Sequence, residues 1–286
     1  MRAPRAAGGA VTPTVPLPGE AHRAPAVRAM FDRIAPTYDL LNRVMTLRVD
    51  QLWRRRLVRE IALGEGERLL DLCAGTMDLA ARARREAPGA RIVGADFSMP
   101  MLSRGVAKTG LPASVADALH LPFSAGSFDA ATVVFGMRNL DSCEAGLREL
   151  ARVLRPGGRL GVLEFFRPES AGPRLVHGLY NRLALPVLGR ALSTDASAYR
   201  YLVESMERFH SRPEFEEAAR RAGFERVRGE TLFPGVCGMV IAVRAAGDEP
   251  PPYGGAPTGG GGTRVAGDAS APQGGAKAGG QRPGRA

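Results

Sequence analysis

Residues 68–80 (RLLDLCAGTMDLA) constrain the fold most, because they join a buried strand to a helix through a tight turn of small residues. The turn occupies residues 73–76, and a helix is expected to start near Asp78. Such a junction presents backbone N–H groups to a nucleotide-like ligand. An ordinary strand–helix connection has the same pattern, so these residues alone leave both interpretations open.

Acidic residues end the next two predicted strands. Asp96 ends a strand over 91–96, about twenty residues after the turn, where a carboxylate is placed to bind ribose hydroxyls. Asp117 follows a short strand over 113–116 and, with the Ala118 backbone, would lie beside an adenine amino group. Two such acids suit S-adenosylmethionine, and the absence of a GxxxxGK[ST] loop argues against a nucleoside triphosphate. The candidate cofactor-binding residues are Asp71, Gly75, Thr76, Asp96, Asp117 and Ala118.

Strand-like and helix-like segments alternate from residue 68 to residue 165, which predicts an α/β fold with a doubly wound parallel sheet. Residues 224–232 and 236–244 predict a terminal antiparallel strand pair. The other expected elements are strands 68–73, 91–96, 113–116, 128–135 and 159–165, and helices 77–86, 98–107, 142–154 and 213–222.

The segments outside this alternation differ in composition. Residues 1–26 and 247–286 are rich in Pro, Gly and Ala and are expected to be disordered, which leaves 27–246 as one folded domain. Residues 27–61 have helical periodicity, interrupted at Pro36, and form an N-terminal helical part. Residues 168–210 are apolar with interspersed arginines, and predict either a helical cap over the sheet edge or an amphipathic element that contacts lipid.

The chain carries a formal net charge of +10, almost entirely from arginine, since only Lys108 and Lys277 are lysines. This charge either reflects genome composition or attracts an anionic surface, namely a membrane or a nucleic acid. No nucleic-acid-binding motif is present, and no window has the roughly twenty apolar residues of a membrane span. The three cysteines lie far apart, which predicts a reducing cytosol, no disulfide framework and no metal site.

Four blocks of the chain resemble the quinone-biosynthesis C-methyltransferases, which methylate demethylmenaquinone or a ubiquinone precursor. They are YDLLNRVMTLRVDQLWRR, LLDLCAGTMDLA, LPFSAGSFDAATVVFGMRNL and LRELARVLRPGGRLGVLEFFRP. AYRYLVESMERF and AGFERV also resemble the family, and the resemblance covers about residues 30 to 243. The FGMRN and RPGGRL blocks are the most specific, because many methyltransferases share the small-residue turn.

The resemblance implies the seven-stranded, Rossmann-like class I methyltransferase fold, S-adenosylmethionine as methyl donor and a polyprenylated quinol as acceptor. Carried over by position, Arg138, Asn139 and Tyr38 lie near the reacting ring. Arg138 would stabilise the developing phenolate, with a second hydrogen bond from Asn139. The competing role for Arg138 is a structural salt bridge, for example to Asp141.

One position departs from the family pattern. Members of the family resemble GTGD where this chain has Gly75–Thr76–Met77–Asp78, and a residue other than glycine at positive φ costs of order 1–2 kcal/mol. Met77 therefore motivates a rival hypothesis, in which the protein is a catalytically weak quinone-binding or scaffold protein. A methyltransferase acting on another small molecule is a third.

The motifs do not decide between the menaquinone and ubiquinone series, and the menaquinone series is the preferred one. The expected location is the cytoplasm, at the inner face of the membrane, with peripheral membrane contact. No nucleic-acid partner is expected, and a homodimer is left open.

Overall fold

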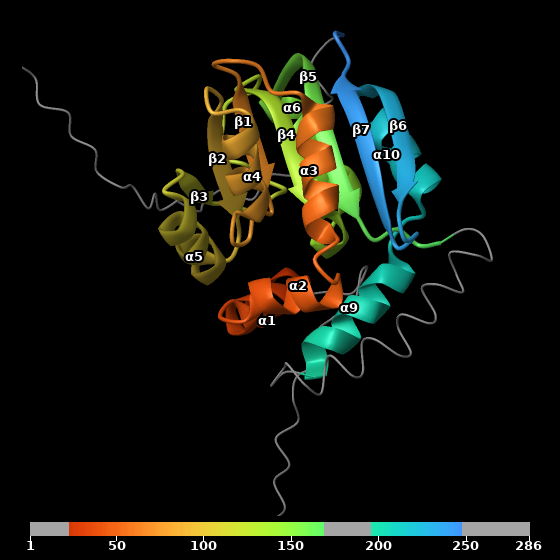
Figure 1. Cartoon of the computed structure of the whole chain (residues 1–286). Helices are drawn as coiled ribbons and strands as arrows, with labels where there is room; N and C mark the ends of the chain where they lie inside the picture. Colours follow the sequence, from red (N-terminus) through yellow and green to blue (C-terminus); the bar gives the residue numbers. More distant parts are fainter. Residues whose placement is uncertain (1–22, 169–195, 248–286) are drawn as a thin grey trace, which may run out of the picture.

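The computed structural model describes residues 23–168 and 196–247, which form a seven-stranded sheet flanked by helices (Figure 1). The strand order is β3-β2-β1-β4-β5-β7-β6, with β1 to β5 parallel and β7 antiparallel to both of its neighbours. This confirms the predicted α/β class and the seven-stranded sheet. The strands are β1 (Arg68–Leu72), β2 (Arg91–Asp96), β3 (Ala113–Val115), β4 (Phe128–Val134), β5 (Leu154–Glu164), β6 (Phe224–Leu232) and β7 (Cys237–Arg244).

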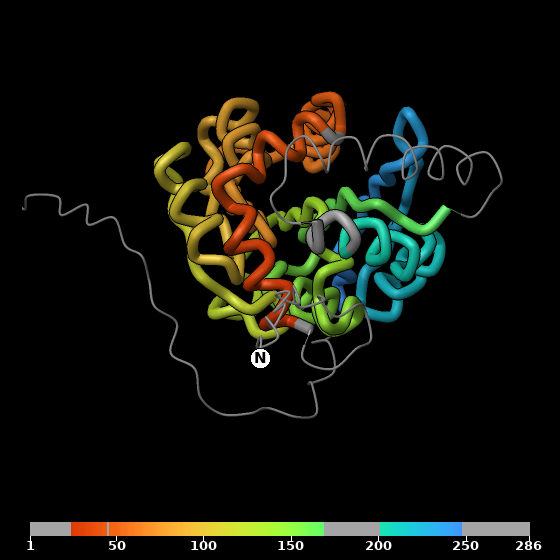
Figure 2. Tube along the Cα trace, turned by 90° about the horizontal axis from the view of Figure 1, so that it is seen from below, coloured from red at the N-terminus to blue at the C-terminus, as the bar shows by residue number. Residues whose placement is uncertain are grey.

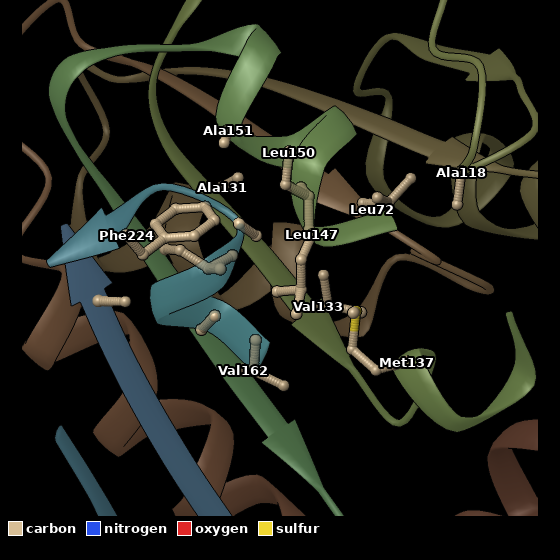
Figure 3. Close-up of a cluster of buried hydrophobic side chains, with 14 of the residues drawn as sticks. Leu72, Ala118, Ala131, Val133, Met137, Leu147, Leu150, Ala151, Val162 and Phe224 are labelled. Atoms are coloured by element: carbon tan, nitrogen blue, oxygen red, sulfur yellow. The ribbon is translucent and has the colours of Figure 1, made fainter. Parts of the chain in front are cut away.

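The helices cover both faces of the sheet and its carboxyl end. The described helices are α1 (Arg23–Ile34), α2 (Tyr38–Met45), α3 (Asp50–Ile61), α4 (Asp78–Glu86), α5 (Met99–Thr109), η1 (Met137–Asn139), α6 (Cys143–Val153), α9 (Ala196–Arg208) and α10 (Arg212–Arg221). One buried cluster joins α6 and α10 to one face of the sheet, and Figure 3 shows Leu147 and Leu150 of α6 pointing at Val133 and Val162. A second cluster joins α3, α4 and α5 to the other face.

Strand β5 begins at Leu154, five residues before the predicted strand over 159–165, and includes the RPGG residues 155–158. Helix α6 ends at Val153 as expected, but the chain enters the sheet at once, where Leu154 pairs with Phe128 of β4. The register shifts before Arg159 pairs with Ala130, so the proline and glycines form an irregular first part of the strand. The proline and glycines follow the end of α6, and the chain stays in the sheet as it passes through them.

The N-terminal part differs from the expectation in two ways. Helix α1 begins at Arg23, four residues before the predicted boundary at 27, and the expected second helical segment is split into α2 and α3. The split falls at Leu47 and Arg48, which both have positive φ. Figure 1 places α1, α2 and α9 below the carboxyl ends of the strands. The predictions for residues 1–22, 248–286 and most of the cap over 168–210 lie outside the described residues.

No helix within 23–168 or 196–247 combines the length and the apolar character of a membrane span.

Met77, the departure from the family pattern, has φ of 61° at the N-terminal end of α4. Its side chain is fully buried and points between β2 and α5, away from the residues that line the cavities described below. Two glycines provide the space: a Cβ on Gly94 would lie 2.8 Å from the Met77 Cε, and one on Gly105 would lie 2.5 Å from its Cγ. The strained backbone of Met77 therefore coincides with a side chain that is fully buried in the core.

We predict that Met77→Ala destabilises the protein by roughly 2–5 kcal/mol, because it empties this space while keeping the strained backbone. Met77→Gly should cost about 1 kcal/mol less than the alanine variant, because it also relieves the left-handed strain. Urea unfolding of the three proteins measures both differences. An alanine variant as stable as the natural chain would show that the Met77 side chain contributes nothing to the core.

Candidate functional site

The Asp96 carboxylate lies at the carboxyl end of β2, where it joins three elements. One oxygen accepts the backbone N–H of Gly75 at 2.9 Å, and the other accepts that of Ser98, the N-cap of α5, also at 2.9 Å. Burial raises the pKa of Asp96 to about 6, because it disfavours the charge more than these N–H groups favour it. A carboxylate has about four acceptor sites, so Asp96 keeps lone pairs for hydroxyl donors.

Asp96 faces a cavity of about 680 Å³, part of it open to solvent, at the carboxyl ends of β1, β2 and β4. Asp117 lies on the same cavity and is exposed; its carboxylate accepts the N–H of Leu119 at 2.9 Å. Five of the predicted site residues in addition to Asp96 line this first cavity: Tyr38, Gly75, Asp117, Ala118 and Asn139.

Two predicted cofactor contacts, Asp71 and Thr76, do not line the first cavity. Asp71 is buried, and its oxygens accept the hydroxyl of Thr132 and the N–H of Ala80, each at 3.1 Å. Burial raises its pKa to about 7. Because Ala80 is in the first turn of α4, Asp71 caps that helix, which corrects its predicted role. The Thr76 hydroxyl donates to the carboxylate of Asp39 on α2.

A second cavity, of about 670 Å³ and partly open to solvent, is lined by residues of α1, α2, α9 and η1. Its walls, like those of the first cavity, are mostly apolar, and its polar lining residues are Arg138, Asn42, Thr46 and the tyrosines Tyr38 and Tyr201. Phe31, Tyr38 and Phe135 line both cavities, so the two adjoin there. Burial raises the pKa of the Tyr38 phenol, which therefore stays protonated at neutral pH.

Arg138 is buried and held by the end of β5. Its Nη1 lies 2.7 Å from Glu164 Oε1 and donates to the carbonyl of Phe135 at 2.8 Å. Glu164 is fully buried and also accepts the backbone N–H groups of Arg138 and Phe165. Glu164 therefore takes the salt-bridge position that the sequence suggested for Asp141.

Asn139 follows Arg138 in η1 and is fixed from both ends of its amide. Its Nδ2 donates to the Phe135 carbonyl at 3.1 Å, and its Oδ1 accepts the hydroxyl of Tyr201 on α9 at 3.1 Å. The Phe135 carbonyl thus binds both of the neighbouring polar side chains of η1.

Sequence reasoning missed an ion cluster that joins α2, α5 and the first residue of α4. Lys108 Nζ lies 2.6 Å from Asp78 Oδ1 and 3.1 Å from Asp39 Oδ2. Burial raises the pKa of Asp78. The hydrogen bond from Lys108 and its positive charge have the opposite effect and together bring the pKa of Asp78 below its usual range. The available signal was a lysine in a chain that otherwise uses arginine. Glu164 was missed as well, although it ends the LEF block.

The ubiE/COQ5 methyltransferase family model matches residues 19–244. The chain belongs to this family. A demethylmenaquinone methyltransferase of Thermus thermophilus is 47% identical over 75% of this chain and 100% of its own length. A ubiquinone/menaquinone biosynthesis C-methyltransferase of Syntrophotalea carbinolica is 42% identical over 76% of this chain and 94% of its own. Membership confirms the predicted family and enzyme class, with S-adenosylmethionine as methyl donor.

Solved structures agree on the fold. An S-adenosylmethionine-dependent methyltransferase of Thermotoga maritima matches with a TM-score of 0.56 at 23% identity, over 76% of this chain and 99% of its own. The [4+2]-cyclase SpnF matches with a TM-score of 0.59 at 20% identity, over 82% and 99%. Since a cyclase shares the architecture, the fold alone does not fix the reaction.

We predict that Lys108→Met weakens S-adenosylmethionine binding roughly three- to tenfold, because the turn loses its tie to α2 and leaves Asp39 facing Asp78. Isothermal titration measures the change. Arg56→Met is the matched control, since it breaks an ion pair of similar length with Glu230 away from the cavities. If both variants bind S-adenosylmethionine with the same affinity, Lys108 has no specific effect on donor binding.

Proposed function

We propose that this protein methylates a ring carbon of demethylmenaquinol to give menaquinol, with S-adenosylmethionine as donor. The observation that carries the proposal is the contact between an acid-rimmed cavity and an apolar one at Tyr38. The first suits a nucleoside, and the second suits a prenylated aromatic ring. The Thermus relative and mycobacterial relatives at 40% identity are named demethylmenaquinone methyltransferases, which favours this acceptor over a ubiquinone precursor.

The residues around the first cavity fit the donor. Asp96 would hold the ribose hydroxyls, because its carboxylate is fixed and keeps free lone pairs. Asp117 and the Ala118 backbone would hold the adenine, and the turn at Gly75 would hold the methionine moiety. When bound, the donor supplies an electrophilic methyl group on a sulfonium.

The chain's own task is then to place and activate the acceptor ring. A quinol carbon becomes nucleophilic when the neighbouring hydroxyl loses its proton to water, and after methyl transfer the same carbon releases its own hydrogen as a proton so that the ring becomes aromatic again. The Arg138 guanidinium cannot take the hydroxyl proton, because its pKa exceeds about 12. It acts instead as a fixed positive charge beside the forming phenolate, oriented by Glu164. Tyr38 is protonated and acts as a hydrogen-bond donor.

Met77 gives little support to the rival scaffold hypothesis. The side chain fills space between β2 and α5 and does not line either cavity. The unusual residue therefore leaves the donor site open. Peripheral membrane contact, a cytoplasmic location at the membrane face and a homodimer remain predictions.

The direct test is to extract lipids from a strain that lacks this gene. Accumulation of demethylmenaquinone, reversed by the natural chain, is the expected result, and an unchanged quinone profile would contradict the proposal. Purified protein should likewise methylate demethylmenaquinol.

Two substitutions should separate donor binding from activation of the acceptor. Asp96→Ala is expected to weaken S-adenosylmethionine binding roughly tenfold to a hundredfold, since it removes charge-assisted hydrogen bonds. Arg138→Lys should leave that affinity within about twofold and lower kcat by roughly a hundredfold. Lysine is chosen because alanine would leave Glu164 buried without its partner. The same losses in both variants would refute this division of roles.

A further inference from the structure

The exposed large apolar side chains of the described residues all lie at one end of the molecule. They are Leu40 (51% exposed), Leu47 (81%), Leu52 (64%) and Phe233 (85%), and we call them the apolar rim. Three of them come from residues 40–52, around the connection between α2 and α3. The fourth lies in the β6–β7 turn, whose Phe233 carbonyl accepts the indole N–H of Trp53 at 2.9 Å. Figure 2 looks onto this end of the molecule.

The segment that carries the rim also forms a wall of the second cavity. Leu41, Asn42 and Thr46 line that cavity, while their neighbours Leu40 and Leu47 face solvent. On the α3 side, Trp53 packs edge-on against Phe165 of the cavity wall, with ring centroids 6.4 Å apart. The rim therefore adjoins the apolar cavity.

The backbone that exposes Leu47 is strained. Leu47 and Arg48 have φ of 50° and 65°, a conformation that residues other than glycine rarely adopt. The turn is held by backbone and side-chain hydrogen bonds, including one from Arg48 N–H to the Arg43 carbonyl and one from the Thr46 hydroxyl to Asp50. Leu47 itself gains no burial from this strain, which marks the connection as a candidate functional feature.

The solvent-exposed charges in the segment that carries the rim are positive. Arg43 and Arg48 are exposed in the same segment, whereas the acidic Asp50 is buried and paired with Arg54. Arginines interleaved with exposed leucines match the surface of an anionic bilayer, in which apolar side chains enter the interface and cations bind headgroups.

We propose that the apolar rim, with Arg43 and Arg48, docks on an anionic lipid bilayer. The inference rests on the proposed function, because a polyprenylated quinol resides in the bilayer. Docking at this end places the second cavity at the membrane surface, so the quinol ring enters it without its prenyl chain crossing water.

The test is sedimentation of the full chain with vesicles of equal parts phosphatidylglycerol and phosphatidylcholine. Leu47→Ser/Phe233→Ser should weaken binding more than tenfold, because both side chains lose their place in the interface. Arg43→Gln/Arg48→Gln should weaken it severalfold. Arg91→Gln/Arg226→Gln is the matched control: it removes the same charge from exposed positions near the amino ends of β2 and β6, and should bind nearly as well as the natural chain.

Methylation assays distinguish a failure of docking from a failure of the proposed function. Leu47→Ser/Phe233→Ser should methylate a water-soluble short-chain demethylmenaquinol at the natural rate and lose activity on quinol embedded in vesicles. A natural chain that methylates the soluble quinol but ignores vesicles would overturn docking and leave the function standing. A natural chain that binds vesicles but methylates neither quinol would overturn the proposed function and leave docking standing. Should the serine variant alter the oligomeric state with vesicle binding unchanged, the rim contacts a second copy and the proposal is wrong.

Discussion

The site depends on the hydrogen bonds that the Asp96 carboxylate accepts from the backbone of Gly75 and Ser98. They join the end of β2 to the small-residue turn and to the start of α5. Helix α1 reaches the same point, because the Ser98 hydroxyl donates to Asp32 at 2.5 Å. Burial makes the charge costly and raises the pKa of Asp96 to about 6, and hydroxyl donors from a ligand would offset part of that cost.

The two cavities are lined by different parts of the chain. Strand ends of the parallel sheet supply the polar rim of the first, while the N-terminal helices and α9 supply the apolar walls of the second. Glu164 ends β5 and fixes Arg138 at the second cavity, so the sheet also orients a positive charge on that cavity. The Tyr38 ring lies where the two cavities meet.

The sequence predicted most of the sheet and part of the site. Alternating strands and helices, with acids at strand ends, were enough to bring Asp96 and Asp117 to one cavity, because the ends of parallel strands converge. The sequence could not predict that Asp71 contacts α4 rather than the cavity, because that contact depends on which face of β1 packs under α4. The orientation of Met77 depends on two glycines from other elements, and Lys108 meets Asp39 only after α2 folds over the turn. Tertiary packing decides all three.

A crystal structure with S-adenosylhomocysteine tests the central claim most directly. The account predicts the ribose hydroxyls within hydrogen-bond distance of Asp96, the adenine beside Asp117 and Ala118, and the sulfur directed toward Tyr38. A nucleoside bound elsewhere, with Asp96 holding only its backbone partners, would contradict it.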